Sequence, residues 1–108
     1  MRVPSIHAFV QIHDTNDGNK WLSFDEIGFI DTLKVRWFLR IREGFKRKGE
    51  HIEGFGEWIS PDYVRGTIRL GAGGDSWFGP NLVAYDEEGS NYLKKLHDAF
   101  SQNKLHNK

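Results

Sequence analysis

Five histidines are the first residues to consider, because neutral imidazole is a common metal ligand. His7 and His13 share one face of a predicted strand, but six residues of strand separate them by roughly 20 Å. His51 and Glu53 have a usable spacing, yet we expect Glu53 to pair with arginines. His97 stands alone in a predicted helix. The sequence therefore predicts no metal site and no cofactor.

Two loop-like stretches resemble known ligand loops only in part. "HDTNDGN" (13–19) has turn residues, but counting back from Gly18 places His13 and Thr15 where a calcium loop needs carboxylates. "GAGGD" (71–75) lacks the lysine of a phosphate loop and is predicted to be a flexible turn. No serine lies in a nucleophile-elbow pattern, and the chain has no cysteine. We therefore expect a protein that is not an enzyme.

A cluster of acids at 86–88 is the densest on the chain. It is either a site for a basic partner or a set of acids near a helix N-terminus, where the helix dipole favours negative charge. We prefer the second interpretation.

Aromatic residues are numerous, with eight Phe, four Trp and three Tyr. Phe9, Phe38 and Phe55 fall on strand faces that should be polar if solvent covers them. Exposed aromatics beside arginines are typical of protein-binding hot spots and of base-stacking surfaces. The alternative is that a second layer covers them, either a short helix or the other subunit of a homodimer.

Length and composition limit the class of protein. A chain of 108 residues corresponds to a single domain, 1–108. Lys plus Arg equals 15 and Asp plus Glu equals 15, and this neutrality argues against a general nucleic-acid binder. The N-terminus lacks a signal-peptide pattern and no stretch is long enough to span a membrane, so we expect a cytoplasmic protein. The charges are segregated: residues 34–48 hold seven cations against Glu43 alone.

Hydrophobic periodicity predicts an α+β fold. The expected architecture is a mainly antiparallel, twisted meander of about five strands, with a C-terminal helix packed on one face. A capping box of Ser23 and Glu26 predicts a short helix at 24–30, and a continuing strand is the alternative. The C-terminal helix is expected to begin at Ser90 or Asn91 and to bury an apolar stripe, and residues 103–108 are expected to fray. The predicted strands cover residues 6–13, 33–42, 51–59, 63–70 and 82–85.

"LKVRWFLRIR" (33–42) alternates apolar and polar residues without a break, which predicts a strand. An antiparallel hairpin with residues 51–59 can place Phe38 opposite Phe55. That register also places Arg36 opposite Glu57 and Arg40 opposite Glu53. The acids then neutralise the arginines, and the pairs mainly specify the register.

"IREGFKRKGE" (41–50) resembles the strand and loop of the single-strand-binding transcriptional coactivator family, whose fold has a curved sheet followed by a helix. The likeness covers Ile41 to about Gly49. It implies a nucleic-acid ligand. The order departs where "YVRGTIRL" (63–70) predicts another strand in place of the helix, so we do not assign the family.

The function that we expect is non-catalytic binding of another macromolecule. The first candidate is a small protein-binding inhibitor of the immunity-protein, antitoxin or phage-inhibitor type, whose partner is a toxin, a nuclease or a host enzyme. The alternative is a single-stranded nucleic-acid binder, and a third reading is a small enzyme or ligand-binding half-barrel with a deep pocket between sheet and helix. The predicted partner-binding residues are Arg36, Phe38, Arg40, Phe45, Lys46, Arg47, Lys48, Glu53 and Phe55.

Overall fold

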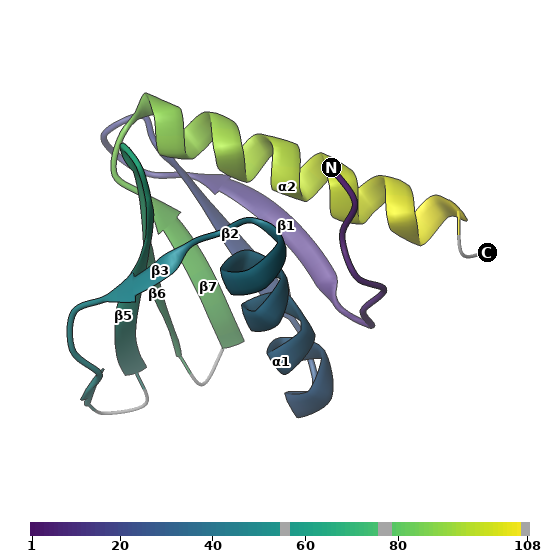
Figure 1. The fold of residues 1–108 in the computed structure, drawn as a ribbon, viewed down its shortest axis with the longest axis horizontal. Coiled ribbons are helices and arrows are strands. Elements are labelled where there is room, and N and C mark those ends of the chain that lie inside the picture. The colour runs from purple at the N-terminus through teal and green to yellow at the C-terminus, as the bar shows by residue number, and fades with distance from the viewer. Residues whose placement is uncertain (55–56, 76–78, 107–108) are drawn as a thin grey trace.

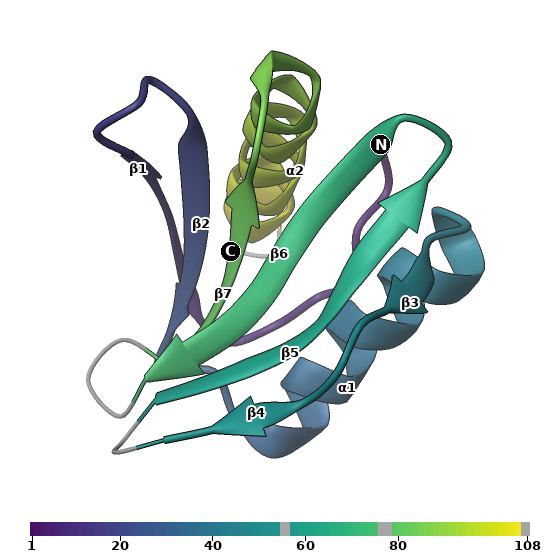
Figure 2. The same ribbon diagram turned by 90° about the vertical axis from the view of Figure 1, so that its left-hand side faces the viewer.

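A computed structural model describes residues 1–54, 57–75 and 79–106. They form one curved antiparallel sheet with both helices on the same side of it (Figures 1 and 2). Six strands follow the order β1-β2-β7-β6-β5-β3, and the short strand β4 also pairs with β5. The elements in chain order are β1 (Phe9–Asp14), β2 (Lys20–Asp25), α1 (Phe29–Trp37), the π-helix η1 (Phe38–Arg42), β3 (Lys46–Lys48), β4 (Ile52–Glu53), β5 (Glu57–Arg65), β6 (Ile68–Asp75), β7 (Gly79–Ala84) and α2 (Glu87–His106).

This architecture confirms the predicted α+β class, with an antiparallel sheet and a C-terminal helix packed on one face. The sheet has seven strands rather than five. In the part of the chain that the structure describes, neither helix combines the length and the apolar character that crossing a bilayer requires.

The first hairpin joins β1 and β2 through the predicted turn. Ile12 pairs with Leu22 in an antiparallel register, and Gly18 adopts a φ of +84° that suits glycine. The helix predicted at 24–30 is wrong, because residues 20–25 continue the hairpin as β2. Ser23 is buried within β2, 3.0 Å from His13 Nε2, and does not cap a helix.

The strand predicted at 33–42 is also wrong, because α1 and η1 cover it. Val35, Phe38 and Leu39 are buried at helical spacing against the sheet. A strand points neighbouring residues to opposite faces, so it cannot bury both Phe38 and Leu39 on one side. The helical turns therefore bury Phe38 together with Leu39 and leave Trp37 and Ile41 exposed.

Without a strand at 33–42, the predicted hairpin with residues 51–59 does not form. The pairings of Arg36 with Glu57, of Arg40 with Glu53 and of Phe38 with Phe55 are therefore wrong as strand pairs. In β4, Glu53 is instead the register partner of Trp58 in β5. Phe55 lies outside the described residues.

Two predicted turns lie inside long strands. Residues 60–62 belong to β5, where the register with β6 is irregular between Ser60 and Tyr63, and the chain turns instead at Gly66. The glycines of 71–75 belong to β6. At two of these positions a neighbouring group lies where a side chain would begin, which explains the presence of glycine. A Cβ on Gly73 would lie 2.6 Å from the carbonyl oxygen of Trp58, and one on Gly71 would lie 2.5 Å from Tyr85 Oη.

The C-terminal helix begins at Glu87, three residues before the predicted cap. Asp86 Oδ1 accepts a hydrogen bond from the Gly89 N–H at 2.8 Å, and Glu88 Oε1 accepts one from Thr67 Oγ1 at 2.6 Å. The acids at 86–88 therefore begin a helix, as preferred from the sequence. The predicted apolar stripe is buried in the core, and residues 103–106 continue the helix. The stripe consists of Tyr92, Leu93, Leu96 and Phe100.

One hydrophobic core connects the two helices to the sheet. Phe24 of β2 meets Phe100 of α2 edge to face, with ring centroids 5.7 Å apart. Phe45, which follows η1, packs on Tyr92 of α2 at 5.1 Å and on Tyr63 of β5 at 6.3 Å. These ring contacts tie the segment after η1 to both α2 and the sheet.

Three polar residues form a hydrogen-bonded cluster at the edge of the core, beside the end of η1. Tyr92 donates its hydroxyl hydrogen bond to Glu43 Oε1 at 2.7 Å, and Arg65 donates to the Glu43 carbonyl oxygen at 2.9 Å. Burial raises the pKa of the Tyr92 hydroxyl, and the hydrogen bond to Glu43 and its negative charge raise it further.

This raised pKa predicts a loss of stability in alkali. The unfolded chain releases the Tyr92 proton near its ordinary pKa of about 10, while the folded chain retains it. The contribution of Tyr92 is therefore complete below about pH 10, and the free energy of unfolding falls as the pH rises above that value. Urea unfolding at increasing pH checks this. Tyr92→Phe should be less stable at neutral pH and should show a shallower alkaline decline; an equal slope in both proteins would contradict the assignment.

Candidate binding surface on α1 and η1

Two large apolar side chains are exposed on the outer side of the α1–η1 segment. Trp37 is 67% exposed and Ile41 is 72% exposed, although both belong to helical turns that bury Phe38 and Leu39 on the other side. Because the two residues are four positions apart, they lie on the same side of the helix. Large exposed apolar side chains that lie together commonly mark interaction sites.

Two open grooves flank this pair of residues. One lies between η1 and the N-terminal segment, where Arg2, Val3 and Pro4 form its other wall. The second lies between η1 and β3, where Lys46 and Arg47 line it. The N-terminal segment is held in place by Asp31, whose carboxylate accepts the His7 backbone N–H at 2.8 Å.

Cations surround the exposed apolar pair. In the part of the chain that the structure describes, no carboxylate forms an ion pair with Arg36, Arg40, Arg42 or Lys46. Lys34 differs, because it lies 3.4 Å from Asp31 one turn earlier. We call the surface made by Trp37 and Ile41 together with these five cations the α1–η1 face; the cations are Lys34, Arg36, Arg40, Arg42 and Lys46.

Arg47 anchors the edge of the sheet beside this face. Its Nε and Nη2 donate to the Pro61 carbonyl oxygen at 3.0 and 2.9 Å, and its Nη1 donates to Tyr63 Oη at 3.2 Å. Its guanidinium stacks 4.2 Å from the centre of the Tyr63 ring. Burial lowers the pKa of Arg47, and the positive charges of Arg36 and Arg40 lower it further. The three arginines are therefore close enough to repel one another.

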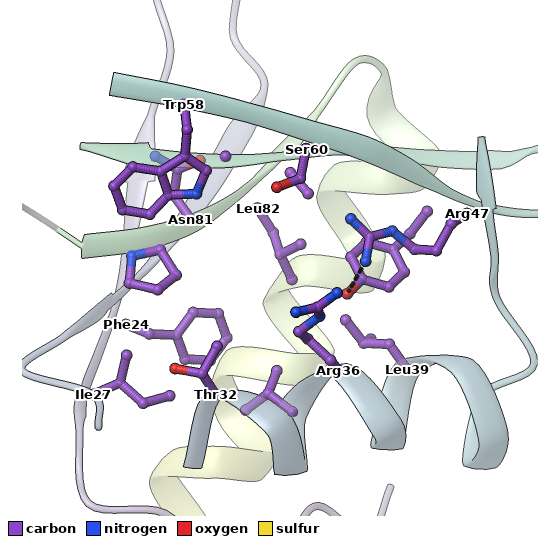
Figure 3. A pocket seen from close by; sticks show the side chains of 15 residues that line it. Phe24, Ile27, Thr32, Arg36, Leu39, Arg47, Trp58, Ser60, Asn81 and Leu82 are labelled. Atoms are coloured by element: carbon purple, nitrogen blue, oxygen red, sulfur yellow. Dashed lines mark hydrogen bonds between the residues drawn. The ribbon is translucent and has the colours of Figure 1, made fainter. Parts of the chain in front are cut away.

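A cavity lies between α1 and the sheet, behind the α1–η1 face. Residues from α1, β2, β3, β5, β6 and β7 line it, and Figure 3 shows the side chains of Arg36 and Arg47 extending into it. Trp58 and Phe24 lie at the other end of the same cavity in that view. The third reading of the sequence required a pocket between sheet and helix, and this cavity occupies that place.

The structure divides the predicted partner-binding residues into three groups. Arg36, Arg40, Lys46 and Lys48 are exposed, and Arg47 is half-buried. Phe38 and Phe45 are core residues, 6% and 2% exposed, so their prediction as contact residues is corrected. They are buried because η1 turns them toward the sheet and α2. Phe55 and the Glu53 side chain lie outside what the structure describes.

The sequence prediction missed Trp37 and Ile41, because the alternation of residues 33–42 puts both on the apolar face of the predicted strand. A helical signal was present, since Val35, Phe38 and Leu39 have the spacing of a buried helix face. The resemblance of 41–50 to a strand and loop also fails locally, because residues 38–42 form a π-helix and only 46–48 form a strand.

Two of the histidines contact neighbouring side chains. His13 stacks on Trp21 with ring centroids 4.0 Å apart, and His97 Nδ1 lies 3.3 Å from Asp98. Within the described ranges, no group of three or more histidines and acids is arranged to hold a metal ion.

Fold and surface together define an α+β protein whose two helices lie on one side of a curved antiparallel sheet and whose first helix presents cations around exposed apolar residues. Comparison of the chain with protein-family models, with curated proteins and with solved structures gives no match. The proposals below therefore depend on the contacts and charges of this chain.

Proposed function

We propose that this chain is a non-catalytic inhibitor of another protein, of the immunity-protein, antitoxin or phage-inhibitor type, and that its α1–η1 face binds an acidic surface of the partner. The observation that carries the proposal is the exposure of Trp37 and Ile41 among cations of which all but Lys34 have no carboxylate partner in the described chain. Tryptophan and arginine are the residues most enriched in protein-binding hot spots. The partner is expected to be a toxin, a nuclease or a host enzyme.

The arrangement of charge supports a protein partner with a complementary surface. Arg36, Arg40 and Arg42 surround an apolar centre that a partner can desolvate, while the cations at the rim steer its approach. The chain as a whole is neutral, but residues 34–48 hold seven of its 15 Lys and Arg residues against Glu43 alone. Such a distribution favours one matching partner over general attraction to polyanions.

Single-stranded nucleic acid remains the alternative ligand, because an exposed tryptophan beside arginines can stack on a base. The burial of Phe38 counts against it, since this side chain was one of two expected to stack on bases. A nucleic-acid complex that neutralises about four phosphates loses roughly three orders of magnitude in affinity for a tenfold rise in salt. A protein interface centred on Trp37 and Ile41 should depend on salt much less.

The test is recovery of the partner from cells that carry the gene, using a photo-crosslinking amino acid in place of Arg40. A second copy of the chain carries the same crosslinker in place of Ile59, on the opposite side of β5 from the cavity-lining Trp58. We expect one protein to crosslink at position 40 and not at 59, and its affinity, when both proteins are purified, to fall much less with salt than that of a nucleic-acid complex. Recovery of nucleic acid alone, or equal crosslinking at both positions, would overturn the proposal.

A further inference from the structure

The cavity between α1 and the sheet has a volume of about 150 Å³ and two chemically different ends. In Figure 3, the side chains of Trp58, Phe24 and Ile27 gather at one end, and those of Arg36 and Arg47 gather at the other. Leu82 lies between the two ends in this view. A ligand that fits both ends must therefore combine an apolar body with a negative charge.

The cavity as a whole has room for one ring, and its apolar end has a suitable lining. An apolar cavity of about 150 Å³ in another protein is large enough to bind benzene. Here aromatic rings of Phe24 and Trp58 and aliphatic side chains of Ile27 and Leu82 supply the wall. Ala72 adds a small side chain to the floor, which leaves the space open.

The cationic end has hydrogen-bond donors that the protein does not use. The Arg36 guanidinium donates no hydrogen bond to any described residue. Arg47 uses three of its five N–H groups on Pro61 and Tyr63, which leaves two. None of the fifteen described residues lining the cavity is acidic, although the negative charge of Asp62 acts on Arg47 from outside this lining. The repulsion between Arg36 and Arg47 is relieved if an anion lies between them.

We propose that this cavity binds a small carboxylate with an aromatic or branched apolar body. Its carboxylate accepts hydrogen bonds from Arg36 and Arg47, and its apolar body lies against Phe24, Leu82 and Trp58. Planar guanidinium groups match the two oxygens of a carboxylate. This site goes beyond the proposed function, because the cavity lies behind the α1–η1 face and does not require the partner protein.

Phenylacetate is the probe, and nuclear magnetic resonance of the full chain is the measurement. We expect saturable shifts of the Trp58 indole N–H and of the backbone amides of Ala72 and Leu82, with a Kd on the order of 1 mM or tighter. Trp58→Phe assigns the indole signal. Phenylacetamide, which has the same shape without the charge, should bind at least about tenfold more weakly.

Variants of the two ends make the test specific. Arg36→Gln removes an exposed cation and should weaken phenylacetate about tenfold, while Arg36→Lys should lose less. Arg42→Gln is the matched control, because Arg42 belongs to the same helical segment but does not line the cavity; it should bind as the unmodified chain does. Ala72→Leu fills the floor and should abolish binding, with the fold checked by circular dichroism.

The carboxylate has two conceivable sources, a free metabolite and the C-terminus of another chain. An acetylated tripeptide ending in phenylalanine, tested beside phenylacetate, distinguishes them by which probe binds more tightly. Three results would overturn the site: no saturable shift with either probe at about ten times the expected Kd, equal affinity for phenylacetamide, or unchanged affinity in Arg36→Gln. These results measure binding of a small carboxylate in the cavity and not binding of a partner protein at Trp37 and Ile41, so failure here leaves the proposed function standing.

Discussion

Replacing Phe45 by alanine should destabilise the protein by about 3–5 kcal/mol. The side chain is 2% exposed and contacts the rings of Tyr63 and Tyr92, and the Arg65 guanidinium lies 4.8 Å from the centre of its ring. The substitution removes this packing and leaves a cavity where the segment after η1 meets α2 and the sheet. Since small domains are stable by only about 5–15 kcal/mol, much of the total is lost. Urea unfolding should show a lower midpoint with an unchanged slope.

Phe29→Ala is the control for this experiment. Phe29 begins α1 with 75% of its surface exposed, so its loss should change the free energy of unfolding by no more than about 0.5 kcal/mol. The comparison also tests the structure against the sequence prediction, because the sequence predicted Phe45 to be a partner-binding residue and the structure places it in the core. If Phe45→Ala kept full stability and lost only partner binding, the position of Phe45 in the core would be wrong.

Replacing Trp37 by alanine should weaken binding of the partner protein by about thirtyfold or more, which corresponds to at least about 2 kcal/mol. The indole is the largest exposed side chain at the centre of the α1–η1 face, with cations on either side. Because two thirds of it is exposed in the free chain, its removal should leave stability nearly unchanged. Titration calorimetry with the purified partner gives the affinity, and urea unfolding gives the stability.

Ile59→Ala is the matched control for Trp37→Ala. Ile59 is 57% exposed, but it lies on β5 and points away from the side of the sheet that carries the helices. It should bind the partner as tightly as the unmodified chain. An affinity that falls with Ile59→Ala and not with Trp37→Ala would move the interface to the outer side of the sheet.

Arg40→Glu should slow association with the partner protein and make the salt dependence of binding weaker, since it reverses a charge at the rim of the α1–η1 face.

Local patterns were sufficient for part of this fold. The strand before Asp14, the turn containing Gly18, the strand predicted at 82–85, which the structure places at Gly79–Ala84, and the C-terminal apolar stripe all follow from periodicity and turn chemistry. These segments have one solution because each buries a single, regular apolar face. The concentration of cations at residues 34–48 was also evident, and these residues still form much of the candidate surface.

Segments whose sequence fits more than one secondary structure were assigned wrongly. Residues 60–62 and 71–75 have the composition of turns, but pairing with neighbouring strands makes them parts of β5 and β6. A capping-box pattern at Ser23 was overridden because Leu22 and Phe24 are buried in the hairpin with β1. In each case long-range contacts outweighed a local preference that is worth only about 1 kcal/mol.

The segment "LKVRWFLRIR" shows most clearly what the sequence alone determined and what only the tertiary structure decided. Its composition determined a basic surface, whichever secondary structure it adopted. Its alternation fitted a strand because Trp37 and Ile41 were assumed to be buried. The structure instead buries Val35, Phe38 and Leu39 and exposes the other two. A strand, with a period of two residues, and a helix, with a period of 3.6, differ here only in which apolar residues lie inside. The free energy of packing against the sheet selects the helix, and no local sequence pattern contains that free energy.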